Sequence, residues 1–204
     1  MTARTETELT GRTSWSAVSG LTGPKVDQLG ARHRKRAFAF VRWWEHSDEA
    51  CKFWVYYKNV AGSDAQQGTA NLSNFRTEFC NGPTNGDQLA VGASTENEFV
   101  TGLQVCLTDK KDDYKNKLKG IRTFSRMWDE HHATLSSEND PVERKLGHCK
   151  KWSRKVSCSA GQVVTQLRVY SRITSDRGEE EHGYAQGIAI GCRELTRVTR
   201  SVAG

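Results

Sequence analysis

Two stretches of the chain follow the same plan, and this internal repetition constrains the fold more than any single motif. FVTGLQV at residues 99–105 matches VVTQLRV at residues 163–169, which begins 64 residues later. After a charged turn, each stretch continues into a second apolar run, LKGI at 118–121 and AQGI at 185–188. The pattern of each unit therefore predicts a strand, a charged turn and a second strand with a Gly-Ile pair. Repetition at a fixed spacing is typical of folds that stack copies of one small unit.

A third unit is expected nearer the N-terminus. One further step of the same length, back from residue 99, reaches the edge of AFAFVRWWEHSDEACKFWVYYKNV, which again has two apolar runs around a charged turn. One hairpin cannot bury its apolar face alone, whereas three hairpins around an axis bury a common core. We therefore predict an all-β fold, a β-prism-like domain over residues 37–200. Its three strand-hairpin repeats are expected at about 37–88, 89–150 and 151–198.

Two segments between the repeats have weaker patterns. Residues 129–147 are charged and contain a proline, so we expect a long surface loop there. Residues 150–158, KKWSRKVSC, are expected to lead into the third repeat.

Residues 1–36 have a different character, because they are polar and rich in Thr, Ser and Gly. We interpret them as a poorly structured N-terminal tail or linker, or as one outer strand that closes the fold. The basic run RHRKR at 32–36 fits a nuclear-import signal, a contact with a polyanion or a dibasic processing site, and it also fits a solvated linker. The net charge of +6 predicts a mild attraction to anionic partners. The other basic residues are scattered rather than gathered on one face, so nucleic acid is not an expected partner.

Six cysteines are dispersed over the strand-like segments, and none forms a C-x-x-C pair. This distribution disfavours zinc and thioredoxin-type redox chemistry and favours a disulfide framework. Fifteen full connectivities are open. Cys158 and Cys192 bracket the last unit, so we expect that pair first. The remaining expected pairs are Cys51–Cys80 and Cys106–Cys149.

The cysteines and the N-terminal residues point to different compartments. A disulfide framework requires an oxidising compartment, but the first residues contain no apolar core of the kind that a secretory signal needs. We expect an extracellular or secretory-pathway location because the cysteines are the stronger signal. No run approaches the roughly 18 apolar residues of a membrane span.

The sequence contains no recognisable catalytic or metal-binding motif. The G-x-S-x-G elbow, the phosphate loop and the H-E-x-x-H helix are all missing, and the six histidines have no zinc-like spacing. We therefore expect a protein that is not an enzyme and that has no cofactor or metal.

The alternation around residues 51–60 offers the clearest candidate for a ligand site. It places Trp54 and Tyr56 on the face opposite the predicted core, between two lysines. Sugars stack their apolar faces on Trp and Tyr rings, and nearby polar groups bind the hydroxyls. Trp44, Trp54 and Tyr56, with Asn59 nearby, are therefore the predicted ligand-binding residues. The alternative is that a neighbouring strand or the N-terminal segment covers them.

The last repeat resembles a known sequence pattern. Trp152, CSAGQVVTQLRVYS at 158–171 and GIAIGCREL at 187–195 are similar to the W…C-[PS]-x-G-x-x-[VI]-T-G-L…G-[IL]-x-[LI]-x-C repeat of vitelline membrane outer layer proteins and jacalin-like lectins. The resemblance covers residues 88–195, and it departs from the pattern at Gln166, where Gly is usual. It implies a three-sheet prism with pseudo-threefold symmetry and a role in carbohydrate binding or an extracellular coat. The family's sugar-contacting residues have no counterpart in this sequence and are not carried over.

Two hypotheses follow. The first is a secreted, non-catalytic, lectin-like protein whose partners are glycans or glycoproteins. The second is a structural subunit of an extracellular coat or larger protein assembly, in which the aromatic face and the basic N-terminal segment contact other proteins.

Overall fold

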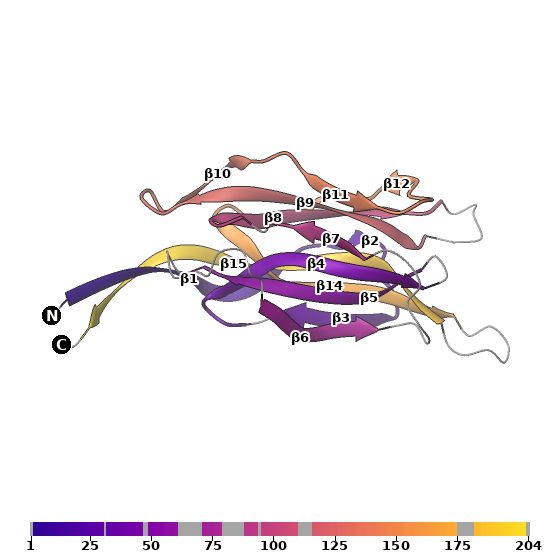
Figure 1. The fold of residues 1–204 in the computed structure, drawn as a ribbon, viewed down its shortest axis with the longest axis horizontal. Helices are drawn as coiled ribbons and strands as arrows, with labels where there is room; N and C mark the ends of the chain where they lie inside the picture. Colours follow the sequence, from indigo (N-terminus) through magenta and orange to yellow (C-terminus); the bar gives the residue numbers. More distant parts are fainter. Residues whose placement is uncertain are drawn as a thin grey trace.

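The computed structural model describes residues 2–30, 32–46, 49–60, 71–78, 88–93, 95–109, 116–174 and 182–202. All regular structure in these ranges is β-strand, arranged in three antiparallel sheets that we call the first, middle and terminal sheets. The strands of all three run roughly along the long axis of the molecule (Figure 1). The prediction of an all-β fold is confirmed.

The first sheet has the strand order β6-β5-β4-β7. Its strands are β4 (Arg36–His46), β5 (Glu49–Asn59), β6 (Asn71–Glu78) and β7 (Leu89–Gly92). Alternation along β5 places Phe53, Val55 and Tyr57 in the core, which is the face that the sequence pattern predicts.

The middle sheet has the order β10-β9-β8-β12, with β11 also pairing with β9 and β13 with β8. Its strands are β8 (Glu98–Leu107), β9 (Leu118–Asp129), β10 (Thr134–Glu138), β11 (Val142–Lys145), β12 (Lys151–Trp152) and β13 (Val156–Ser157). In Figure 1 it forms the upper layer of the molecule.

The terminal sheet joins both ends of the chain. It has the order β1-β15-β14-β3, with β2 also pairing with β15. Its strands are β1 (Thr2–Trp15), β2 (Ser19–Gly20), β3 (Lys25–Gly30), β14 (Gln162–Thr174) and β15 (His182–Val202). Beyond the prism, β1 and β15 pair only with each other among the described strands, from Glu8↔Thr196 to Thr2↔Val202. Figure 1 shows this two-stranded ribbon extending to the left, with both termini at its tip.

All three sheets contribute to one core between them. Its fully buried members include Phe38 and Trp43 of the first sheet, Leu103 of the middle sheet, and Leu167 and Ile188 of the terminal sheet. A smaller apolar cluster, which includes Leu9, Phe99, Trp128 and Leu195, lies near the base of the ribbon. The molecule is therefore a three-sided prism of sheets around an apolar interior, as the hairpin pattern predicts.

The three central hairpins share a bulge near the start of their first strand. The residue skipped in the pairing register is Ala39 in β4, Thr101 in β8 and Thr165 in β14. A bulge bends its strand and increases the local twist. The common bulge helps each sheet to curve around the shared core.

The N-terminal segment requires a correction. We expected a poorly structured tail or linker, or one outer strand that closes the fold, and the structure agrees only with the second possibility. Residues 2–30 form β1, β2 and β3, which flank β14 and β15. The polar composition misled the prediction because β1 and β3 lie at sheet edges, where many of their side chains face solvent.

Two further expectations were wrong. The surface loop expected at 129–147 contains β10 and β11, which pair with β9. Their side chains are mostly exposed, so the sequence carries no apolar alternation there. Residues 151–157 form β12 and β13 on the edge of β8 in the middle sheet, and so do not join the last hairpin.

Two disulfides agree with the expected pairing. Cys158 is bonded to Cys192 and Cys106 to Cys149, with Cα atoms 5.7 Å and 5.6 Å apart. The third expected pair, Cys51–Cys80, lies outside the described residues, since the side chain of Cys51 and all of Cys80 are undescribed.

Candidate functional site

The outer face of β4 and β5 carries a row of aromatic and cationic side chains, which we call the ringed face. It is formed by Phe40, Arg42, Trp44, Lys52, Trp54 and Tyr56, which point away from the core because their neighbours along each strand point into it. This is the face that the sequence analysis selected.

Stacked rings dominate the ringed face. The Phe40 and Tyr56 ring centroids are 4.4 Å apart with nearly parallel planes, and the Arg42 guanidinium lies 5.2 Å from the Tyr56 centroid. The Trp44 and Trp54 centroids are 5.1 Å apart. In these contacts the rings and the cation pack against one another in the geometries that such pairs prefer.

The predicted ligand-binding residues are only partly brought together. Trp44 and Trp54 are in contact, whereas Tyr56 stacks on Phe40 and Asn59 lies at the far end of β5, opposite Arg36. Trp44 is 8% exposed and Tyr56 5%, so these two rings offer little surface to a sugar. Trp54 is more exposed and is the accessible ring of the set.

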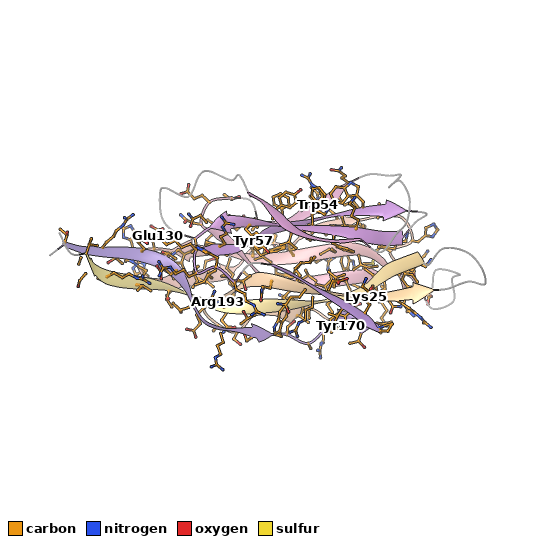
Figure 2. All side chains as sticks on the ribbon, turned by 90° about the horizontal axis from the view of Figure 1, so that it is seen from below. Lys25, Trp54, Tyr57, Glu130, Tyr170 and Arg193 are labelled. Atoms are coloured by element: carbon orange, nitrogen blue, oxygen red, sulfur yellow. A yellow bond between two sulfur atoms is a disulfide. The ribbon has the colours of Figure 1, made fainter. Side chains whose placement is uncertain are left out.

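A second feature lies on the outer face of the terminal sheet. It is a hollow of about 400 Å³ formed by residues from β1, β3, β14 and β15 and the segment after β3. Its lining consists of Gly11, Arg12, Thr13, Trp15, Gln28, Arg32, Gln166, Arg168 and Arg193. Figure 2 shows Arg193 well apart from Trp54, so the hollow and the ringed face are separate surfaces.

An irregular pairing of β1 builds one wall of the hollow. The register of β1 with β15 shifts between Thr10↔Glu194 and Ser14↔Cys192, so residues 11–13 lie opposite Arg193 alone. Extra residues in one strand leave the regular ladder and change the direction of their side chains.

Two glycines keep the floor of the hollow open beside Gln166. Gly30 on β3 and Gly191 on β15 both pair with Gln166. A Cβ at Gly30 would lie 2.7 Å from Gln166 Cα, and a Cβ at Gly191 would lie 3.0 Å from Trp15 Cη2. Gly30 also has φ +133°, a backbone conformation that is strained for a residue with a side chain. A residue larger than glycine at either position would therefore fill or distort the floor.

Arg193 holds the walls of the hollow together. Its Nε donates to the Gly11 carbonyl at 3.2 Å, and its Nη1 to the Arg32 carbonyl at 3.2 Å. Its Nη2 donates to the Leu9 carbonyl at 3.1 Å. Burial lowers the pKa of the Arg193 guanidinium, which nevertheless stays charged because arginine does not lose its proton in proteins.

Arg168 and Trp15 form the aromatic part of the hollow. The Arg168 guanidinium carbon lies 3.9 Å from the Trp15 ring centroid, and its Nε donates to Gln28 Oε1 at 3.3 Å. The middle sheet contains a similar set, in which Arg122 lies 4.1 Å from the Trp152 ring centroid and donates to Gln104. Arg122 differs because it is also ion-paired to a carboxylate, that of Glu143, at 2.9 Å from Nε.

No pattern in the sequence predicts the hollow. Its residues come from both ends of the chain, and no local pattern marks them. Two sequence features contain lining residues of the hollow. They are the departure at Gln166 from the Gly of the repeat, and the basic run that includes Arg32.

Neither a metal site nor a spanning helix is found in the ranges that the structure describes. No three His, Cys, Asp or Glu side chains there lie close enough to hold an ion. In the same part of the chain, no helix has the length and apolar character needed to cross a membrane.

Comparison with known proteins identifies the fold. No protein-family model and no curated protein matches the sequence. The solved structure of single-chain recombinant jacalin matches with a TM-score of 0.53 and 6% identity, over 90% of this chain and 96% of jacalin. A mannose-binding jacalin-related lectin of Ananas comosus matches with a TM-score of 0.47 and 8% identity, over 89% of this chain and 98% of the lectin.

The V. cholerae biofilm matrix protein Bap1 also matches, with a TM-score of 0.48 and 12% identity. The match covers 95% of this chain, which spans only 27% of the Bap1 chain. The likeness to jacalin, together with the three sheets, shows that this chain has the all-β, prism-like fold of the jacalin-related lectins.

Proposed function

We propose that the protein is a non-catalytic, lectin-like carbohydrate-binding protein that works outside the cell. The jacalin-type fold supports a role in glycan binding. The two disulfides support an oxidising, extracellular setting. Its partners would be glycans or glycoproteins.

The observation that carries this proposal is the make-up of the hollow. Saccharide sites combine an aromatic ring, on which the apolar face of a sugar packs, with a few polar groups that bind its hydroxyls. The hollow combines the Trp15 ring with the amides of Gln28 and Gln166. Its volume of about 400 Å³ is in the range of small-ligand sites.

The test is a glycan array with neutral and acidic saccharides, followed by calorimetry on the saccharides that bind. Trp15→Ala should weaken binding about five- to thirtyfold, since removing the ring costs roughly 1–2 kcal/mol. Trp152→Ala is the matched control, because Trp152 is also packed against an arginine but lies on the middle sheet. Absence of binding to every saccharide would exclude this function.

The ringed face is a second proposed carbohydrate surface. There Trp54 would be the more accessible ring, with Trp44 and Tyr56 supporting it and Asn59 further along the strand. If Trp54→Ala abolishes glycan binding while Trp15→Ala does not, the ringed face is the site and the hollow is not.

A structural subunit of an extracellular assembly is the alternative function. The ribbon of β1 and β15 favours it, because β1 is an edge strand whose unpaired backbone groups can add a strand from another chain. Sedimentation of the full chain and of a variant with charged residues at Ala3 and Thr5, which are both exposed, would test it. Assembly of the full chain that is lost in the variant would favour this function, and a monomer at every concentration would reject it.

A further inference from the structure

We propose that the hollow on the terminal sheet binds an anionic saccharide, a sugar that carries sulfate or carboxylate groups. This inference rests on the proposed carbohydrate-binding function and specifies the class of ligand. Arg12, Arg32 and Arg168 would supply the charge, the part of the Trp15 ring that Arg168 leaves uncovered an apolar contact, and Gln166 a polar contact.

The charge of the hollow is the first argument. Among the lining residues that the structure describes, four are arginines and none is an aspartate or glutamate. None of the four makes an ion pair with any residue that the structure describes. Uncompensated positive charge in a concave site focuses the electrostatic potential and raises the local concentration of anions.

A neighbouring set of cations near the ribbon is neutralised by carboxylates, unlike the arginines of the hollow. Glu8 forms ion pairs with Arg34 and Arg200, and Glu6 forms ion pairs with Arg4 and Lys35. In the hollow, no carboxylate of a described lining residue plays that part. An anionic ligand would therefore neutralise the arginines of the hollow, as protein carboxylates neutralise the cations near the ribbon.

The arginines retain free donors in a geometry suited to oxyanions. Arg193 uses three of its five N–H donors on backbone carbonyls. Arg168 uses Nε on Gln28, and its stacking on Trp15 fixes the guanidinium plane. A planar guanidinium with free Nη groups binds a carboxylate or sulfate through two parallel hydrogen bonds.

Gln166 provides an independent indication of a polar ligand. Its side chain lines the hollow although the residue is only 2% exposed. Its amide makes no hydrogen bond with the described part of the chain, and it is not among the fully buried groups that lack a partner, so it opens into the hollow and can take a partner from solvent or from a ligand. A ligand hydroxyl or oxyanion beside Trp15 would supply that partner.

The shape of the hollow favours a saccharide over a nucleic acid. Single-stranded nucleic acids bind along grooves with several aromatic rings, on which successive bases stack. The described lining of the hollow has one ring, Trp15, and a floor made by β3, β14 and β15. One sugar ring with its charged substituent matches this arrangement.

The experiment compares oligosaccharides that differ in charge: isomalto-oligosaccharides and their sulfated forms share one backbone, and oligogalacturonates carry carboxylates on another. Isomalto-oligosaccharides, their sulfated forms and oligogalacturonates are titrated into the full-length, oxidised protein by calorimetry at low and at physiological salt. We expect the charged saccharides to bind at least tenfold more tightly than the neutral ones, and more weakly as salt increases. Arg12→Gln and Arg168→Gln should each weaken binding of the charged saccharides about five- to tenfold. Arg122→Gln is the matched control, because it removes the same charge beside Trp152, and it should leave binding unchanged.

Four results would overturn the inference. If neutral and sulfated forms bind equally, and the Arg12 and Arg168 variants match the wild type, the protein is a lectin whose ligand is not anionic. If no saccharide binds, neutral or charged, the proposed function itself fails. If Arg122→Gln weakens binding as much as Arg168→Gln, or if inorganic sulfate or an oligonucleotide of equal charge binds as tightly as the sulfated sugar, the hollow does not select an anionic saccharide.

Discussion

The outer faces of the first and terminal sheets differ at the strand positions that follow the shared bulge. Directly after the shared bulge, the first sheet pairs Phe40 with Tyr56, and the two rings stack at 4.4 Å. The terminal sheet pairs Gln166 with Gly191 at the corresponding position. A ring pair covers the strands in one sheet, and an amide beside a glycine leaves a hollow in the other.

The next positions along the strands repeat the contrast. Arg42 lies opposite Trp54 in the first sheet, whereas Arg168 lies opposite Ala189 in the terminal sheet. Arg168 therefore finds its aromatic partner, Trp15, on the added strand β1. The comparison teaches that aromatic and cationic side chains on a sheet can serve packing or binding, and that the residue opposite them decides which.

The largest expected effect distinguishes two tryptophans by stability. Trp44→Ala should lower the free energy of unfolding by about 3 kcal/mol, because Trp44 is 8% exposed and packs on Trp54. Trp15→Ala should cost about 1 kcal/mol, because that ring is only half-buried. Urea denaturation followed by circular dichroism measures both. Equal losses would show that Trp15 is as structural as Trp44.

The second prediction concerns arginines within the hollow. Arg193→Gln should lower the free energy of unfolding by about 2 kcal/mol, because three carbonyls lose a charged donor. Arg12→Gln should change it by less than about 0.5 kcal/mol, because Arg12 is exposed and its side chain makes no hydrogen bond or ion pair with the described residues. Both values come from the same denaturation experiment. A costly Arg12 variant would mean that Arg12 holds the wall as Arg193 does.

The third prediction transfers the ring pair from one face to the other. The double variant Gln166→Phe with Gly191→Tyr should weaken saccharide binding at least tenfold, about 1.4 kcal/mol, while the protein stays folded. A side chain at 191 must displace Thr13 and Trp15, whose atoms would lie 2.9 and 3.0 Å from its Cβ. Calorimetry with the saccharide selected by the array measures the effect, and unchanged affinity would place the binding site elsewhere.

The fourth prediction concerns Lys58, at the end of the first sheet. Burial lowers its pKa to about 8, below the usual 10.5, although its ammonium donates to the Ala93 and Thr95 carbonyls. Between these two pKa values the unfolded chain binds more protons than the folded chain, so stability rises with pH.

From pH 8 to pH 9 we expect the stability of the wild type to rise by about 1 kcal/mol relative to Lys58→Met, in which this titration is removed. Denaturation of both proteins at the two pH values measures the difference. A constant difference would show that the lysine charge is not buried at a cost in the folded state.

The sequence predicts the parts of the fold that depend on local alternation. The matching strands at 99–105 and 163–169 correspond to β8 and β14, and Phe53 and Val55 face the core as expected. Apolar residues repeat every second position in these strands because one face must be buried. The same rule predicts the outward face of Trp54, but not the stacking of Phe40 on Tyr56 or the low exposure of Trp44.

The missed elements lack that local signal. Thr134–Glu138 and Val142–Lys145 are strands only because they pair with the edge of β9, and their side chains stay largely in solvent. The hollow depends on pairings between strands at opposite ends of the chain, such as Trp15 with Gly191. A local sequence pattern cannot predict contacts between residues so far apart in the chain.

The origin of the hollow in both chain ends has a consequence for the order in which the protein folds. The first and middle sheets use strands that are near one another in sequence, so they can form while the chain is being made. The hollow needs Trp15 and Gln28 from the start of the chain and Arg193 from its end. It is therefore completed last, and saccharide binding would report that the whole chain has folded.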